Sequence, residues 1–432
     1  MLTPIIIASV TAISMVVAVI LKPYITKGKI TIGLYWIICL VGAIAMLISG
    51  SITLPEVISG ITADTAVNPL KILVLFLSVT LISLYLGDAG FFDYLADYLF
   101  RKNKNGQIKL FLALYFLVAV LTVFTSNDII ILTFTPPICI FCKRAKISPI
   151  PFLFGEFVAA NTWSMMLIVG NPTNIYLATS VGVSFFEYFS VMALPAIVGG
   201  ITGLIMLLLI FRKSLRDPLI KENGYLSPTP KINKIPLIVS LIHLGVCIVL
   251  LAISDFIGLE MWIICLVLFL SLFVFHFIYE IVAKKRVRKT MRVLLKAPFE
   301  LIPFILSMFV IVLALTKSGV TNILNQALVS GSKWDGVKFG FISAISANLL
   351  NNIPMSVLFS QIVGAGKYAL FGTVIGSNVG AFIASVGALA GIMWGKILSQ
   401  NGVKLPFYKF MAYGTAIALP VIATSTFMLF LV

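Results

Sequence analysis

Polar residues that could bind an ion or a small solute interrupt four long apolar stretches of this chain. Two of the interruptions are clusters in the middle of a run, Thr125-Ser126-Asn127-Asp128 and Asn351-Asn352-Ile353-Pro354. The third is Gly170-Asn171-Pro172-Thr173-Asn174, and the fourth is a glycine-rich stretch around Gly387. Amide and hydroxyl groups hydrogen-bond neutral hydroxylated solutes, and their oxygens also ligate cations. The four interruptions are therefore the candidate chemistry of this chain.

Asp128 and Glu156 are the acidic residues in these stretches and the candidates for coupling to an ion. Protonated and desolvated, Asp128 would carry a proton; ionised, it would bind Na⁺. Its alternative role is a structural carboxylate paired with helix amino ends. Glu156 precedes Asn161 by one to two turns, and it lies either at the same depth or near the cytoplasmic interface.

Other chemistries are less well supported by the residues. Cys139 and Cys142 are spaced to bind a soft metal or metalloid, but cysteine in an apolar segment is more often a small hydrophobe. His243 and His276 lie in different predicted spans, and no His-Glu-x-x-His motif or phosphate-binding Gly-x-x-x-x-Gly-Lys occurs. We expect neither an enzyme, a metal centre nor a cofactor, and no ATP-driven step on this chain.

The elements that hold these residues must be membrane helices. Of the 432 residues, 60% are hydrophobic and 11% are charged, against about 25% charged in ordinary water-soluble domains. Apolar runs near spanning length occur at 2–21, 30–52, 70–87, 190–211, 235–254, 259–283, 298–316 and 406–431. The composition predicts an all-α polytopic protein with about ten transmembrane helices, and no cleavable signal peptide is evident.

Two runs, 110–142 and 337–363, are predicted to be re-entrant hairpins. In the first, arms of about 15 residues flank the polar cluster, and both outer ends are basic, which places them on one side of the bilayer. With residue 1 outside, this threading puts 26 of the 31 Lys and Arg residues in the cytoplasm. We therefore interpret the net charge of +16 as a signal of membrane topology, and we expect no nucleic-acid partner. The protein is expected in the inner membrane with both termini outside.

The two halves of the chain repeat each other. Asn161 and Gly170 recur as Asn378 and Gly387 at an offset of 217 residues, and the first polar cluster recurs in the second at 224. Because the predicted threading reverses direction between the copies, the repeat is inverted, which is typical of secondary transporters. The first predicted half is 1–211; its scaffold helices are 1–52, and its hairpin and broken helix are 110–181. The second predicted half is 235–432; its scaffold helices are 235–283, and its hairpin and broken helix are 337–398. A cytoplasmic linker, 212–234, joins them.

Unwound backbone at membrane depth must line a cavity or be buried in protein, so the four interruptions should converge on one binding site. The predicted site residues are Ser126, Asn127, Asp128, Asn161, Gly170, Asn171, Thr173 and Asn174 from the first half and Asn351, Asn352, Ser377, Asn378 and Gly387 from the second. Taken singly, each Asn is better explained by hydrogen bonding between helices, whereas the repeated pair of clusters favours a binding site. The predicted spans and hairpins hold almost no Lys or Arg near their centres, which favours a neutral substrate over an anion.

The tip sequences, together with Gly376-Ser377-Asn378-Val379-Gly380 and Trp394-x-x-x-Leu398-x-x-x-Gly402, resemble the ArsB-type arsenite pumps of the ion transporter superfamily. The resemblance covers nearly the whole chain. It implies a homodimeric scaffold, a moving domain that carries the hairpins in an elevator-like cycle, and efflux of arsenite or antimonite in exchange for protons. Some such pumps associate with an ATPase subunit, for which 212–234 and 284–296 are candidate docking surfaces.

Two alternatives remain open at this stage. One is a Na⁺-coupled carrier of citrate or dicarboxylates, or a Na⁺/H⁺ antiporter, because the stretch 170–174 is more like those branches of the superfamily. The other is an ion channel or membrane sensor built on the same hairpins. Strict Na⁺ dependence would indicate the first, and conductance above carrier turnover would indicate the second.

Overall fold

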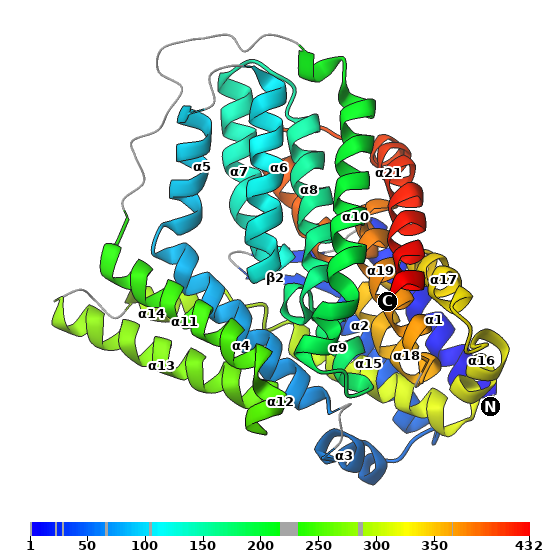
Figure 1. Cartoon of the computed structure of the whole chain (residues 1–432). Helices are drawn as coiled ribbons and strands as arrows, with labels where there is room; N and C mark the ends of the chain where they lie inside the picture. The colour runs from blue at the N-terminus through cyan, green and yellow to red at the C-terminus, as the bar shows by residue number, and fades with distance from the viewer. Residues whose placement is uncertain are drawn as a thin grey trace.

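A computed structural model describes residues 2–21, 24–27, 30–64, 68–102, 106–216, 232–283, 288–364 and 366–432. In this part of the chain the fold is almost entirely helical, with one antiparallel pair of strands, β1 (Tyr24–Lys27) and β2 (Ile30–Gly33) (Figure 1). Most of the predicted linker, 217–231, and part of the predicted basic docking surface, 284–287, lie outside the described residues.

Seven helices in the described ranges are long and apolar enough to cross a bilayer, or eight if one bent pair is a single span. The seven are α1 (Leu2–Leu21), α4 (Pro69–Asp88), α6 (Gln107–Phe124), α10 (Phe185–Phe211), α11 (Lys234–Ala252), α13 (Met261–Val282) and α21 (Phe407–Met428) with η6 (Leu429–Leu431). The bent pair is α15 (Leu301–Lys317) and α16 (Val320–Leu328), which meet at 78°. The shorter apolar helix α2 (Leu34–Ile48) occupies most of the predicted run 30–52. The prediction of an all-α polytopic membrane protein is confirmed.

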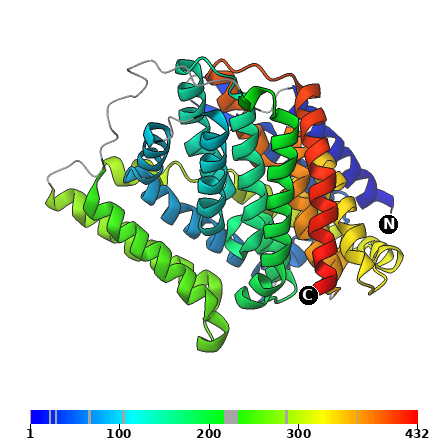
Figure 2. The same cartoon turned by 45° about the horizontal axis from the view of Figure 1, so that its top comes forward.

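Large apolar side chains remain exposed on the outermost helices, as a lipid environment requires. Examples are Ile13 of α1, Val249 of α11 and Val274 of α13. Helices α11 and α13 pack on each other and on α4, and lie at one side of the molecule in both views (Figures 1 and 2). The two histidines, which lie in different predicted spans, are both on this helix pair: Ser240 bonds His276, and His243 bonds Ser271, each at 3.2 Å. Both side chains thus serve helix packing.

The two predicted hairpins are pairs of helices that meet at the polar clusters. Helix α6 ends at Phe124, and α7 (Asn127–Arg144) begins after the two residues Thr125 and Ser126. Helix α17 (Trp334–Leu350) and α18 (Asn352–Val363) are separated by Asn351 alone, whose φ of 70° makes the turn. The first pair is longer than predicted, with 18 residues in each arm. Because α6 is itself long enough to span, the re-entrant course of the chain stays a prediction.

The two predicted broken helices are each divided by a pair of 3₁₀ turns. In the first half, η1 (Ser164–Met166) and η2 (Ile168–Gly170) separate α8 (Ile150–Trp163) from α9 (Pro172–Ser180). In the second half, η4 (Gly380–Phe382) and η5 (Ser385–Gly387) separate α19 (Lys367–Val379) from α20 (Leu389–Gln400). Helix α19 packs closely along α17, where a β-carbon at Gly376 would overlap the carbonyl oxygen of Gly340. Small residues permit such close approach between membrane helices.

The remaining helices are short and connect the long ones: α3 (Leu54–Thr62), α5 (Phe91–Lys102), α12 (Ser254–Ile257), α14 (Arg288–Leu294) and the turn η3 (Ser214–Arg216). Helix α3 begins with a capping box, in which the Glu56 carboxylate accepts a hydrogen bond from the Thr53 backbone N–H at 2.8 Å. The other oxygen of Glu56 lies 2.6 Å from Nζ of Lys317 at the end of α15. This ion pair ties α3 to the bent pair.

The pair between Glu56 and Lys317 makes the stability of this corner depend on pH. Hydrogen bonds from Lys317 and Thr53 lower the pKa of Glu56 from 4.5 to about 2. A carboxyl group whose pKa falls on folding stabilises the fold above its unfolded pKa, and that stabilisation is lost as the pH drops through the folded pKa. We expect Glu56→Gln, which keeps a capping amide, to lower the melting temperature by at most about 2 °C at pH 7. Below pH 2 the variant and the wild type should melt together.

The measurement is a thermal melt of the purified protein at several pH values and in 1 M NaCl, which should shrink the difference by screening. Lys317→Met is the matched change on the other partner, and the double variant should be no less stable than either single variant. Additive losses would show that the two side chains do not act as a pair.

Candidate functional site

The two broken helices meet at Asn378, which is fully buried near the end of α19. Its side-chain oxygen accepts hydrogen bonds from Nδ2 of Asn171 at 2.8 Å and from the hydroxyl of Ser164 at 3.2 Å. Its own Nδ2 donates to Oδ1 of Asn174 at 2.7 Å. Asn378 therefore binds three polar side chains of the first half across more than 200 residues of sequence.

A further hydrogen bond joins α9 and α19, from the hydroxyl of Ser377 to that of Thr173 at 3.0 Å. Asn171 caps α9 by accepting the N–H of Thr173, and Nδ2 of Asn174 donates to the unwound carbonyl oxygens of Ser164 and Leu167. The backbone groups that the broken helix leaves free are thereby partly satisfied. Gly170 is required in this turn because a β-carbon there would overlap the carbonyl oxygen of Ser164.

The first hairpin tip is connected to this cluster. Nδ2 of Asn127 donates to Oδ1 of Asn161 at 3.0 Å, and the carbonyl oxygen of Asn161 accepts the hydroxyl of Ser164 at 3.0 Å. Because Ser164 also contacts Asn378, a continuous chain of polar groups runs from the tip into the second half. We call these residues the amide network: Asn127, Asn161, Ser164, Asn171, Thr173, Asn174, Ser377 and Asn378. Ser164 was absent from the sequence prediction, since a lone serine between Trp163 and Met165 carries no pattern.

The second hairpin tip has its own arrangement. Oδ1 of Asn352 is buried and accepts no hydrogen bond from the residues described, and the same holds for the hydroxyl of Ser126 at the first tip. Asn351 caps α18 by accepting the N–H of Ile353. Among the described residues, no hydrogen bond joins Asn352 to the amide network. Each tip therefore carries one buried polar group without a hydrogen-bond partner among the described residues.

Gly387 belongs to a contact that the sequence did not indicate. Asn348, on α17, donates to the carbonyl oxygens of Ala344 and Gly380 at 2.8 Å each and accepts the N–H of Ala384 at 2.9 Å. A β-carbon at Gly387 would lie 2.6 Å from Oδ1 of Asn348. Asn348 thus supports the second break much as Asn174 supports the first. The sequence feature that could have indicated this role is the position of Asn348, three residues before Asn351.

The two acidic candidates differ in their surroundings. Asp128 lies in the first turn of α7, where its backbone N–H donates to Asn127, and no side chain in the described ranges bonds its carboxyl group. Glu156 is fully buried on α8, with both oxygens within 3.0 Å of the Thr135 hydroxyl and with the Trp394 indole close by, outside hydrogen-bond geometry. That hydroxyl also lies 2.6 Å from the carbonyl oxygen of Ile131. The Thr135 hydroxyl has one hydrogen. It can donate this hydrogen to an ionised Glu156, or it can donate to the carbonyl oxygen of Ile131 and accept a hydrogen bond from a protonated Glu156.

The remaining candidate ligands do not assemble into a metal centre. Cys139 and Cys142 are buried in α7, and the residues described contain no group of three or more His, Cys, Asp or Glu side chains suited to a metal ion. Cys247 and Cys265 are also buried, with sulfur atoms 3.7 Å apart between α11 and α13. These cysteines pack as small apolar side chains.

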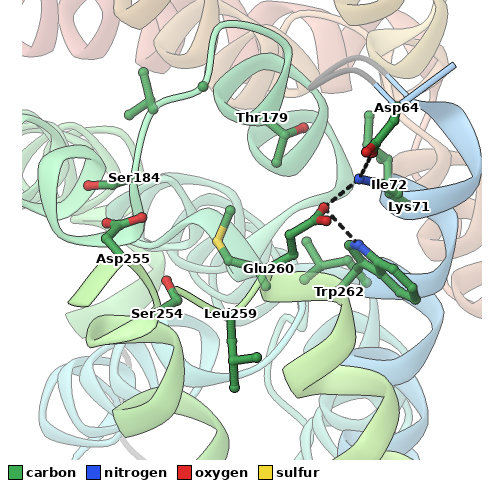
Figure 3. Close-up of a pocket in the computed structure, with 14 residues that line it drawn as sticks. Asp64, Lys71, Ile72, Thr179, Ser184, Ser254, Asp255, Leu259, Glu260 and Trp262 are labelled. Carbon is green, nitrogen blue, oxygen red and sulfur yellow. Dashed lines mark hydrogen bonds and ion pairs between the residues drawn. The ribbon is translucent and has the colours of Figure 1, made fainter. Parts of the chain in front are cut away.

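A cavity of about 380 Å³ lies where α4, the α9–α10 turn and the α12–α13 region meet (Figure 3). Nζ of Lys71 bridges Asp64 at 2.5 Å and Glu260 at 2.6 Å, and the indole N–H of Trp262 donates to Glu260. The bond from Lys71 lowers the pKa of Asp64, so this carboxylate stays ionised at neutral pH. Because its central charges are mutually paired and partly exposed, the cavity lacks the desolvated groups of a catalytic centre.

Comparison with known proteins agrees with this architecture. Residues 16–370 match the model of the CitMHS family, described as citrate transporter. An arsenical pump membrane protein of Escherichia coli K12 is 30% identical over 366 residues, covering 80% of this chain and 83% of the relative. Another from Escherichia coli is 28% identical with 94% of both chains covered, and a putative arsenical pump membrane protein of Bacillus subtilis is 25% identical.

The apolar helices and these matches indicate a multi-pass membrane transporter. The chain belongs to the citrate transporter family and is an ArsB-type member of the ion transporter superfamily. The resemblance predicted from the tip sequences is thereby confirmed.

Proposed function

We propose that this protein is a proton-coupled secondary transporter that expels arsenite, antimonite or a similar small neutral oxyacid across the plasma membrane. The observation that carries the proposal is the amide network, a buried set of neutral amide and hydroxyl groups between two broken helices. Arsenous acid is an uncharged trihydroxy molecule at neutral pH, so hydrogen-bonding groups of this kind match its chemistry. Relatives named as arsenical pumps support the same assignment.

The proposed cycle is an elevator-like alternation between two faces of the membrane. The predicted moving parts are the hairpins and broken helices of both halves, and the predicted scaffold is 1–52 and 235–283. Asp128, and Glu156 as the second candidate, would take up and release the coupling proton. The proposal includes a homodimer in an inner membrane with both termini outside, no cofactor beyond the coupling ion, and an optional ATPase subunit.

A second candidate follows from the family match. The model that covers residues 16–370 is described as a citrate transporter, so Na⁺-coupled carboxylate transport is the alternative. No Lys or Arg belongs to the amide network. A carboxylate would therefore depend on helix amino ends, hydroxyl groups and bound Na⁺ for its charge, which makes this assignment the weaker one.

The test is uptake into everted membrane vesicles energised with a proton gradient, in parallel with arsenite and with citrate. We expect arsenite to accumulate, and collapse of the proton gradient to stop accumulation, whether Na⁺ is present or replaced by K⁺. Vesicles without the protein are the control. Citrate uptake that requires Na⁺, with no arsenite uptake by folded protein, would replace the proposal with the second candidate.

A further inference from the structure

Glu156 is a buried carboxyl group that side chains of both halves of the chain surround. It lies on α8 with 0% of its surface exposed. The Thr135 hydroxyl of α7 is within 3.0 Å of both its oxygens, and the indole of Trp394 on α20 lies beside it. Helices α7 and α8 belong to the first half and α20 to the second. A change in the charge of Glu156 therefore acts on both halves at once.

The contacts of the Thr135 hydroxyl indicate the protonation state of Glu156 in this structure. The hydroxyl has one hydrogen, and the carbonyl oxygen of Ile131, 2.6 Å away, can only accept it. This contact is shorter than those to the two carboxyl oxygens, at 2.9 and 3.0 Å. If the hydroxyl hydrogen is directed to Ile131, the bond to Glu156 requires a hydrogen from the carboxyl group. The geometry therefore fits a protonated Glu156.

The surroundings of Glu156 also favour the protonated form. Among the described residues of the helices packed on α8, which are α6, α7, α10 and α19, the titratable group that interacts electrostatically with Glu156 is the Cys139 thiol of α7. No Lys, Arg or His in the described ranges does so. Burying a carboxylate without a cation is costly, and protonation removes most of that cost.

Trp394 carries a hydrogen-bond donor that this arrangement leaves unused. Its side chain is 1% exposed, and its indole N–H has no partner in the described part of the chain. Buried N–H groups are nearly always bonded, so an unused donor beside a carboxyl group is informative. An ionised Glu156 accepts hydrogen bonds only, and it could accept one from Trp394 in addition to one from Thr135. The donor thus matches a partner that forms when the proton leaves.

Trp394 also borders a cavity of about 510 Å³, which could receive that proton. Other residues that line the cavity are Ser399, Lys404 and Phe407, from the end of α20 to the start of α21, and the predicted threading places Lys404 in the cytoplasm. A cavity of this size with polar walls admits water. Glu156 itself does not line it. Trp394 therefore has the cavity on one side and the carboxyl group on another.

We propose that Glu156 and Trp394 form a proton-dependent tie between the two halves, positioned by Thr135. With the proton on Glu156, the carboxyl O–H donates to Thr135, the Thr135 hydroxyl donates to Ile131, and Trp394 stays unbound. When the proton passes to water in the cavity, the Thr135 hydrogen turns to the carboxylate, and the indole N–H donates to it as well. Helix α20 is then tied to α8. As a step of transport, this inference rests on the proposed function.

The first experiment does not depend on transport. It follows the infrared band of protonated carboxyl groups in the purified protein as the pH is raised. We expect a band at pH 7 that Glu156→Gln lacks. Trp394→Phe removes a donor that only the ionised form uses, so the pH at which the band disappears should rise by about one unit or more. Thr135→Val should raise it as well, because a charge-assisted bond is lost, and Thr135→Ser should restore the wild-type value.

Two matched controls should titrate as the wild type does. Trp36→Phe removes another buried indole N–H without a partner among the described residues, on α2. Thr426→Val removes a buried hydroxyl that bonds carbonyl oxygens of its own helix, α21. The tie would be overturned by the lack of a band that depends on Glu156, or by equal midpoints in Trp394→Phe, Thr135→Val and the wild type. A band that persists to the highest pH at which the protein stays folded would also overturn it.

The second experiment tests whether the tie belongs to the transport cycle. Arsenite uptake into everted vesicles is measured against the pH of the cytoplasmic side, at equal amounts of folded protein. The pH profile of Trp394→Phe and Thr135→Val should move in the alkaline direction by about one unit, as the infrared midpoint does. An unchanged profile beside a shifted midpoint would exclude the tie from transport. Wild-type vesicles that take up no arsenite would refute the proposed function alone, since the infrared titration still decides the tie.

Discussion

Arsenite accumulation driven by a proton gradient is expected to fall by about tenfold or more in Asp128→Asn. Asparagine has the size and hydrogen-bonding shape of the carboxyl group but cannot exchange a proton. Asp128 lies at the start of α7, next to Asn127 of the amide network, and no described side chain pairs with its carboxyl group. If the proposed function holds, coupling is the most direct role for a carboxyl group that lacks a structural partner.

The measurement compares uptake in everted vesicles with the gradient intact and collapsed, at equal amounts of folded protein. The matched control is Asp255→Asn, which removes an exposed carboxyl group in α12 and should transport as the wild type does. Exchange of arsenite at equilibrium, without a gradient, should survive in Asp128→Asn if binding is intact. Gradient-driven accumulation at the wild-type rate would exclude Asp128 as the coupling residue and move the test to Glu156→Gln.

The second large effect is expected at Asn378. Asn378→Ala removes the partner of Asn171, Ser164 and Asn174 together, all of them fully buried or nearly so. At roughly 0.6–1 kcal/mol for each bond between membrane helices, we expect a loss of about 2–3 kcal/mol in unfolding free energy. Transport per folded molecule should fall by about tenfold or more, because the cluster that joins the two halves is broken.

Unfolding in detergent and vesicle uptake, normalised to folded protein, measure the two effects separately. Asn401→Ala is the matched control, since Asn401 bonds only one carbonyl oxygen of its own helix, that of Ile397, through its side chain. Asn378→Asp is the finer probe, because it keeps the acceptor but cannot donate to Asn174 when ionised. A destabilised Asn378→Ala that transports normally would assign the amide network to packing and not to substrate binding.

Much of the architecture could be predicted because the bilayer constrains each segment locally. Hydropathy and length located α1, α4, α11, α13 and α15 to within a few residues, since a span must be apolar over its whole length. The interruptions were equally visible, because a polar cluster or an Asn-Pro pair inside an apolar run ends a helix there. The arms of the first hairpin were underestimated because Gln107, Lys109 and Lys143 are polar residues inside helices, where hydropathy alone ends the segment early.

The partners of the site residues were decided by the tertiary structure alone. The amide types and positions were evident from the sequence, but the pairing of Asn378 with Asn171 and Asn174 depends on how α19 packs against α9. The same holds for Ser164, for Asn348 beside Gly387, and for the position of Trp394 beside Glu156. Membrane insertion acts on each segment by itself, so it leaves a local record in the chain. Contacts between residues some 200 positions apart follow from the packing of whole helices and leave no such record.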